Sequence, residues 1–256
     1  MRLLLEYDGA GYAGWQLQVG HRTVEAEVRR AILDVTGEAA KVYAAGRTDA
    51  GAHAEGQVAN FHYAGRLAPH RLAAALNARL PSDVAVLRVD EVPADFHARY
   101  SARWRHYRYR FLDRTARPAL DRGRCWHLRT RLDVEAMAAA AAPLVGSHDW
   151  TTFCAASEPP QDRVRTVREA RVVRVGDVVE LHLLGDGFLR GLVRSIAGAL
   201  AEVGRGRRPP EWVGEVLAAR DRRLAPPTAP AGGLTLVKVL YDDESTPPWD
   251  TLPPRT

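Results

Sequence analysis

The feature that most constrains the fold is an alternation of strand and helix patterns that occurs twice along the chain. Short apolar or period-two segments predict strands, and apolar residues spaced three and four apart predict helices. In the first half the strands are expected at 2–7, 42–45, 57–63 and 84–92, with helices at 24–36 and from 69 through 80. In the second half the strands are expected at 105–111, 164–184 (a hairpin turning near 176–177) and 234–240, with helices after Asp133, at 189–203 and from 210. This pattern predicts an α+β protein with two similar halves.

A break at Pro93-Ala94-Asp95 separates these halves. We therefore expect an N-terminal α+β domain at 1–100 and a C-terminal α+β domain at 101–245. Residues 246–256 are expected to form a disordered tail.

One predicted strand, 105–111, alternates with period two. Side chains of alternate residues lie on the same face of a strand, so Tyr107, Tyr109 and Phe111 share one face. The opposite face carries the basic residues His106, Arg108 and Arg110, and we expect it to meet water or phosphate.

The stretch from 45 to 53 reads Ala-Gly-Arg-Thr-Asp-Ala-Gly-Ala-His and lies between two predicted strands. Loops held by a rigid sheet often carry working residues, which makes Asp49 a candidate. Gly46 and Gly51 allow a tight turn or the close approach of another segment. On composition alone, however, we would favour a polar turn, in which Thr48 and Asp49 bind backbone amides, over a catalytic carboxylate.

The run Gly46-Arg47-Thr48-Asp49-Ala50-Gly51, followed by His53-Ala54, resembles the signature of the TruA family of tRNA pseudouridine synthases. Further segments are similar to that family in the same order along the chain. They are Tyr7-Asp8-Gly9 with Gly14-Trp15-Gln16, residues 95–102, Tyr107-Arg108-Tyr109, and Phe188-Leu189 with Val193-Arg194. These matches extend across nearly the whole chain.

The resemblance implies two similar α/β-sandwich-like domains whose mainly antiparallel sheets join side by side, with the catalytic cleft between them. It implies an isomerase that converts uridine to pseudouridine at positions 38 to 40 of the anticodon arm of tRNA. It also implies a homodimer in which both subunits hold each tRNA. Recognition is expected to rest on tRNA shape and phosphates, because A-form helices hide their sequence in a deep groove.

The resemblance also assigns catalytic roles to three residues. Asp49 matches the family's nucleophile, which adds to the substrate and later leaves. Arg194 matches the arginine that pairs with it, and a cation is needed because burial alone disfavours an ionised carboxylate. Tyr107 matches the tyrosine that stacks on the target base, and its hydroxyl is a candidate to help remove the C5 proton. The sequence leaves open whether Asp49 attacks the base or the ribose carbon.

Two of these residues also have plain structural interpretations. Arg194 is typical of a surface residue one helical turn after Arg190, and Tyr107 is typical of a core residue in an alternating strand. Some residues near Arg194 depart from the family's pattern, namely Asp186, Gly191 and Leu192.

Arg47 and His53 are the remaining candidates for substrate binding. For Arg47 we favour contact with phosphate over bracing of the loop, and we interpret His53 and His97 as loop-ordering or RNA-facing residues. With Asp49, the two histidines also suggest a metal-dependent nuclease or hydrolase, but no clustered Cys/His spacing supports a metal site. The other alternative, a non-catalytic RNA-binding protein of the same fold, is disfavoured by the presence of Asp49.

Composition limits the class of protein without choosing a function. The net charge of +5 comes almost entirely from arginine, since lysine occurs only at Lys41 and Lys238, and this is compatible with tRNA binding. The 2 cysteines, Cys125 and Cys154, imply neither a disulfide framework nor a four-cysteine zinc site. No phosphate-binding glycine motif and no metal-ligand spacing occur, so we expect no nucleotide cofactor and no metal. Without a long apolar segment, we expect a cytoplasmic protein with no membrane span.

Overall fold

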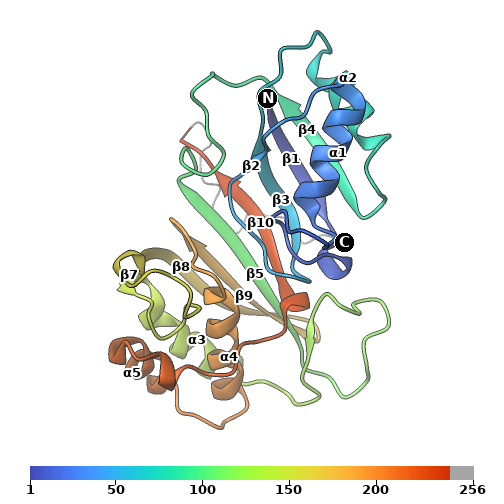
Figure 1. The fold of residues 1–256 in the computed structure, drawn as a ribbon. Helices are drawn as coiled ribbons and strands as arrows, with labels where there is room; N and C mark the ends of the chain where they lie inside the picture. The colour runs from blue at the N-terminus through green and yellow to red at the C-terminus, as the bar shows by residue number, and fades with distance from the viewer. Residues whose placement is uncertain (243–256) are drawn as a thin grey trace.

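The computed structural model describes residues 1–242, which form a ten-stranded sheet and five α-helices (Figure 1). The strands are β1 (Arg2–Tyr7), β2 (Tyr43–Ala44), β3 (His53–Asn60), β4 (Val84–Asp90), β5 (Trp104–Leu112), β6 (Trp126–His127), β7 (Gly146–Asp149), β8 (Val164–Val175), β9 (Val178–Gly185) and β10 (Leu234–Leu240). The helices are α1 (Val24–Thr36), α2 (Pro69–Asn77), α3 (Val134–Ala141), α4 (Leu192–Gly204) and α5 (Glu211–Ala219).

The strands follow the order β4-β1-β3-β10-β5-β9-β8-β7, with β2 added to β3 and β6 added to β5. The pairings are antiparallel except those of β10 with β3 and of β5 with β6. A mainly antiparallel α+β fold is therefore confirmed. The last strand, β10, lies between β3 and β5 and joins the two halves into one continuous sheet. The division into domains at 1–100 and 101–245 remains a prediction, and the tail at 246–256 lies outside the described residues.

A row of paired residues shows that both halves present the same face of the sheet to the helices. Tyr7 pairs with Ala54, Ala54 with Leu236, and Leu236 with Tyr107. Directly paired residues point to the same face, and these four side chains are buried. Figure 1 shows α1 and α2 over one half, α3, α4 and α5 over the other, and β10 with β5 running between the two groups.

Local sequence signals account for where α1 begins and ends. The hydroxyl of Thr23 accepts a hydrogen bond from the amide of Ala26, which satisfies one free donor at the helix N-terminus. Gly37 follows the last turn with φ of 75°, a left-handed conformation that favours glycine. The predicted helix at 24–36 is confirmed.

The predicted bounds were wrong for α4 and β3. The helix expected at 189–203 begins at Leu192, because Gly191 has φ of 76° and is therefore left-handed. The strand expected at 57–63 spans 53–60 instead, and its first residue, His53, pairs with Thr235 of β10. Apart from Glu55, the residues of β3 are buried, so a period-two pattern could not mark its start.

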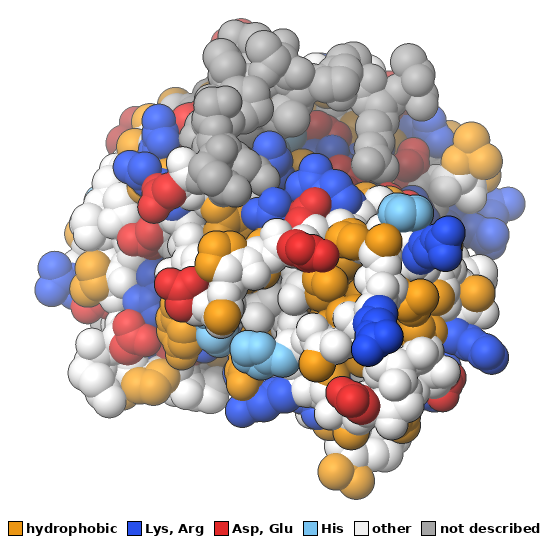
Figure 2. Space-filling view, turned by 90° about the horizontal axis from the view of Figure 1, so that it is seen from above, with side chains coloured by type: hydrophobic (Ala, Val, Ile, Leu, Met, Phe, Trp, Pro, Cys, Tyr) orange, Lys and Arg blue, Asp and Glu red, His pale blue; other side chains and the backbone are white. Residues whose placement is uncertain are grey.

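The basic face of β5 differs from our expectation of water or phosphate. His106 is buried, and Arg108 and Arg110 bind carboxylates of the protein itself. On the face of the molecule seen in Figure 2, Lys and Arg side chains are likewise interspersed with Asp and Glu. The two arginines on this face of β5 are thus matched by acidic neighbours.

Two further expectations concern the chain as a whole. Within residues 1–242, each helix is too short or too polar to cross a bilayer. Cys125 and Cys154 are both free thiols, one half-buried and one buried.

Candidate active site

Asp49 lies on the loop that connects β2 to β3, as the sequence predicted. Ala44 pairs with Ala59 in the sheet, and the amide of Ala45 donates to the carbonyl of Val58 at 2.8 Å. The loop therefore begins directly after a sheet hydrogen bond, and the sheet fixes its starting point.

The segment between β1 and α1 holds this loop from one side. The amide of Trp15 donates to the carbonyl of Thr48 at 3.1 Å, and the amide of Gly51 donates to the carbonyl of Tyr12 at 3.2 Å. The hydroxyls of Tyr7 and Thr48 hydrogen bond at 2.8 Å. These contacts fix the loop on both sides of its carboxylate.

Two glycines make this close packing possible. A Cβ atom on Gly9 would lie 1.8 Å from the carbonyl oxygen of Ala52, and one on Gly14 would lie 2.7 Å from that of Thr48. Gly14 also has φ of 101°, which favours glycine. The close approach to the loop thus explains why glycine stands in Tyr7-Asp8-Gly9 and in Gly14-Trp15-Gln16.

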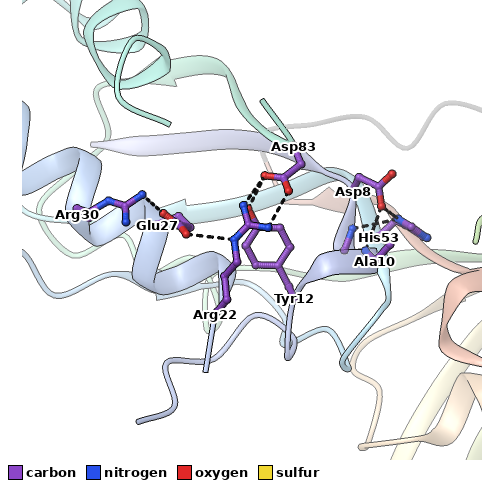
Figure 3. Close-up of polar contacts among 9 residues, drawn as sticks. Asp8, Ala10, Tyr12, Arg22, Glu27, Arg30, His53 and Asp83 are labelled. Carbon is purple, nitrogen blue, oxygen red and sulfur yellow. Dashed lines mark hydrogen bonds and ion pairs between the residues drawn. The ribbon is translucent and has the colours of Figure 1, made fainter. Parts of the chain in front are cut away.

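An ionic cluster in turn anchors the segment between β1 and α1 (Figure 3). The guanidinium of Arg22 binds both carboxylate oxygens of Asp83 at 3.0 and 3.1 Å, and its Nε lies 3.4 Å from Glu27. The hydroxyl of Tyr12 donates to Asp83. Since the carbonyl of Tyr12 accepts from Gly51, the cluster helps to fix the loop.

His53 is buried at the start of β3. Its Nδ1 accepts a hydrogen bond from the amide of Gly9 at 3.1 Å, and its Nε2 lies 2.8 Å from the carbonyl oxygen of Gly123. Asp8 also lies beside Nδ1, as Figure 3 shows. Both ring nitrogens therefore contact the protein, which favours the loop-ordering interpretation of His53 over contact with RNA.

The structure brings Asp49 and Arg194 together from opposite halves of the chain. Nη1 of Arg194, in the first turn of α4, donates to Oδ2 of Asp49 at 2.9 Å. Nε of the same guanidinium donates to the carbonyl of Ala229 at 2.8 Å. The segment carrying Ala229 packs closely on α4, because Gly198 leaves room for the carbonyl of Pro227. One donor thus orients the guanidinium while another holds the carboxylate.

This ion pair is only partly covered. The side chains of Asp49 and Arg194 are 22% and 23% exposed, so a small group can reach them from solvent. Within residues 1–242, no group donates to Oδ1 of Asp49. The second carboxylate oxygen is therefore available to a substrate.

Tyr107 lies on β5 next to the same loop. A Cβ atom on Gly46 would lie 3.3 Å from the Tyr107 hydroxyl, so a larger residue at 46 would crowd it. The ring packs edge-on against Phe188 with 5.0 Å between centroids. Burial raises the pKa of the Tyr107 hydroxyl above its usual range, so it is protonated at neutral pH. None of the described residues hydrogen bonds with this hydroxyl.

Arg105 is a residue of the site that the sequence reasoning did not single out. Its guanidinium is buried, and burial lowers its pKa. It donates to the carbonyls of Ala45, Arg99, Ala102 and Asp186. Arg105 thus ties together the loop of Asp49, the segment before β5 and the turn that leads to α4. The sequence does offer one signal: Arg105 lies two residues before Tyr107 in an alternating strand, which places both side chains on the same face.

The residues near Arg194 that depart from the family's pattern fit this backbone. The carboxylate of Asp186 accepts from the amide of Thr166 at 3.0 Å, which closes the turn after β9. Gly191 adopts the left-handed conformation just before α4, and Leu192 is buried. The departures leave the first turn of α4, and with it Arg194, in place.

Neither Arg47 nor His97 hydrogen bonds to Asp49 or Arg194. Arg47 is exposed, and its side chain bonds to none of the described residues. His97 lies in the segment before β5, where its Nδ1 accepts from the amide of Arg99 at 3.1 Å. Within residues 1–242, no three His, Cys, Asp or Glu side chains are grouped to hold a metal ion, so Asp49, His53 and His97 do not form a common site.

Comparison with known proteins decides the family. A family model described as tRNA pseudouridine synthase matches residues 4–101 and 140–242. The tRNA pseudouridine synthase A of Moorella thermoacetica is 46% identical over 94% of this chain and 99% of its own length. The proteins of the same name from Halalkalibacterium halodurans and Myxococcus xanthus are 44% and 43% identical, over 91% and 95% of this chain and 89% and 92% of their own lengths. The chain belongs to the tRNA pseudouridine synthase family.

As a member of this family the protein is an isomerase that acts on tRNA. The synthase reaction breaks one bond to the ribose and forms another, with no net oxidation or hydrolysis. The geometry offers a carboxylate with one free oxygen, a cation that stabilises its charge, and a ring beside it. These are the elements that covalent catalysis at a sugar or base requires.

Proposed function

We propose that the synthase modifies uridines 38 to 40 of the anticodon arm, with Asp49 as nucleophile. The observation that carries this proposal is the ion pair between Asp49 and Arg194, because it presents an accessible carboxylate between the two halves. The target uridine leaves the base stack to reach it, since its reacting atoms are inaccessible within a helix.

In the proposed reaction Asp49 adds to the substrate, either at the ribose carbon or at the base, and the bond from N1 to the ribose breaks. The uracil turns so that C5 bonds to the same ribose carbon. C5 then loses its proton, N1 takes up a proton, and the Asp49 carboxylate leaves unchanged. Because one proton is lost and one is gained, the product has the same composition as the uridine, and the reaction is an isomerisation.

The neighbouring residues are given supporting roles. Arg194 stabilises the negative charge that Asp49 needs, and Tyr107 stacks on the displaced base. Arg47 contacts phosphate, a role supported by its exposure beside Asp49. His53 supports the loop from within. We further propose that domains 1–100 and 101–245 form the two walls of the cleft, and that a homodimer holds each tRNA.

The test is to treat unmodified tRNA with the purified protein and to map pseudouridine along the whole molecule. We expect modification at positions 38, 39 or 40 wherever a uridine is present, and unmodified uridines elsewhere. An otherwise identical tRNA with cytidine at those positions is the control and should remain unmodified. Pseudouridine confined to another arm of the tRNA would contradict the proposed position.

A further inference from the structure

The segment between β4 and β5 carries an aromatic array that the proposed reaction does not use. The ring of His97 lies 4.8 Å from that of Tyr43 in β2 and 4.5 Å from that of Tyr100, measured between centroids. The outermost ring, Tyr100, is 77% exposed. We define these three residues as the ring platform.

Basic groups lie at both ends of the ring platform. Nζ of Lys41 lies 5.0 Å from the centre of the Tyr43 ring, and the guanidinium carbon of Arg99 lies 5.6 Å from that of Tyr100. Both cations are exposed, and neither pairs with a carboxylate among the described residues. Rings for stacking beside unpaired cations are the combination that single-stranded nucleic acids bind.

Hydrogen bonds hold the backbone that carries the platform and orient its central ring, His97. The amide of Ala98 donates to Oδ1 of Asn60 at 2.8 Å, and the hydroxyl of Tyr241 donates to the carbonyl of Ala98 at 2.8 Å. The ring of His97 is oriented through Nδ1, which accepts from the amides of Arg99 and Tyr100. A preformed surface of this kind loses little conformational freedom when a ligand binds.

Arg105 fixes the platform next to the catalytic loop. Its guanidinium donates both to the carbonyl of Arg99, beside Tyr100, and to that of Ala45, four residues before Asp49. Tyr43 also lies in β2, the strand that leads into this loop. One side chain, Arg105, therefore links the segment that carries the platform to the loop of Asp49.

We propose that the ring platform stacks an unpaired nucleobase of the tRNA next to the target uridine. When the target leaves the stack, its neighbour loses a stacking partner, and the Tyr100 ring replaces that partner. Arg99 and Lys41 contact the flanking phosphates. This inference rests on the proposed function for its choice of RNA.

The test compares Tyr100→Ala with Tyr100→Phe, using tRNA that carries 2-aminopurine beside the target uridine. We expect Tyr100→Ala to bind tRNA about 10-fold more weakly than wild type and to lose the quenching of 2-aminopurine fluorescence. Tyr100→Phe keeps the ring and should behave as wild type. Leu87→Ala, which truncates an exposed apolar side chain on the edge strand β4, is the matched control and should change neither signal.

Wild-type affinity and quenching in Tyr100→Ala would overturn the platform, as would equal losses in Tyr100→Phe. A change in oligomeric state without a change in tRNA affinity would assign the rings to a protein interface instead. These outcomes are separate from the mapping of pseudouridine by wild-type protein. If wild type modifies positions 38 to 40 while Tyr100→Ala binds normally, the platform fails and the proposed function stands.

Discussion

The two faces of β5 carry charged residues in different ways. On the face away from the helices, Arg108 lies 2.7 Å from Glu55 and 3.7 Å from Glu180. Arg110 on the same face lies 3.0 Å from Asp121 and 3.4 Å from Glu180. On the other face, beside Tyr107, the nearby carboxylate has one cation and one free oxygen.

The difference separates structural charges from functional ones. Where each arginine meets two carboxylates, the charges stabilise one another, and little unpaired charge remains to bind a ligand. Asp49 instead meets Arg194 through a single oxygen, and Arg47 beside it is unpaired among the described residues. We infer that substitutions on the site face change turnover, whereas those on the opposite face change stability.

Among the residues that support Asp49, the largest effect is expected for Arg194→Ala, because Asp49 would lose the cation that stabilises its charge. The rate of pseudouridine formation under single-turnover conditions should fall by about 100-fold or more, with tRNA affinity little changed. Arg190→Ala removes an exposed arginine just before the same helix and serves as the control. Equal rates for the two variants would show that the cation has no catalytic role.

A smaller loss of rate is expected at Tyr107, through the stacking of the base. Tyr107→Leu should slow single-turnover formation of pseudouridine by about 10-fold or more, since one stacked base contributes about 1–3 kcal/mol. Tyr107→Phe keeps the ring, so any rate that it loses measures the contribution of the hydroxyl. If Leu and Phe variants were equally slow, the hydroxyl and not the ring would be the important group.

On the opposite face, Arg108→Met should reduce stability while leaving turnover intact. Its loss leaves Glu55 without its 2.7 Å partner in a half-buried setting, and we expect a cost of about 2 kcal/mol. Denaturant unfolding measures this cost, and Arg103→Met, whose ion pair with Asp242 is largely exposed, provides the control. A slower single-turnover rate in Arg108→Met would break the distinction between the faces.

The smallest effect is a pH dependence of stability at His106. Burial, with His182 and Arg108 nearby, lowers the pKa of His106 to about 3. The unfolded chain binds this proton near pH 6.5 and the folded protein does not, so stability falls as the pH drops below 6.5.

Thermal melts between pH 7 and pH 5 test this dependence. His106→Gln should flatten the acid slope of the melting temperature, whereas His70→Gln, at an exposed position in α2, should leave it unchanged. An acid slope that His106→Gln does not alter would assign the effect to other groups.

Periodicity and capping signals predicted much of the fold before the structure. Thr23 and Gly37 cap α1 at the bounds expected from periodicity, 24–36, and the alternation in β5 places Tyr107 in the core. The same alternation placed Arg108 and Arg110 on the opposite face but did not predict what they contact there. Their carboxylate partners come from other strands or from a loop. Local patterns cannot show such partners.

The candidate site was predictable only where a motif carried it. Asp49 and Arg194 were chosen through a family resemblance, since 145 positions separate them in sequence. Arg105 was missed because its partners are backbone carbonyls of three segments, and the alternating strand places it on the face of Tyr107 without showing these partners. The position of β10 between the halves depends likewise on pairing between residues that are distant along the chain.

The most direct test of the account measures Asp49→Asn and Glu180→Gln in one experiment. For each variant, pseudouridine in tRNA under single-turnover conditions is measured beside the melting temperature. Asn keeps the shape of Asp49 and can still cap amides, so its cost in stability should be on the order of 1 kcal/mol. We predict that Asp49→Asn forms no pseudouridine yet folds and binds tRNA, whereas Glu180→Gln melts earlier but turns over at the wild-type rate. Turnover near the wild-type rate in Asp49→Asn would contradict the account and reduce Asp49 to a residue of a turn.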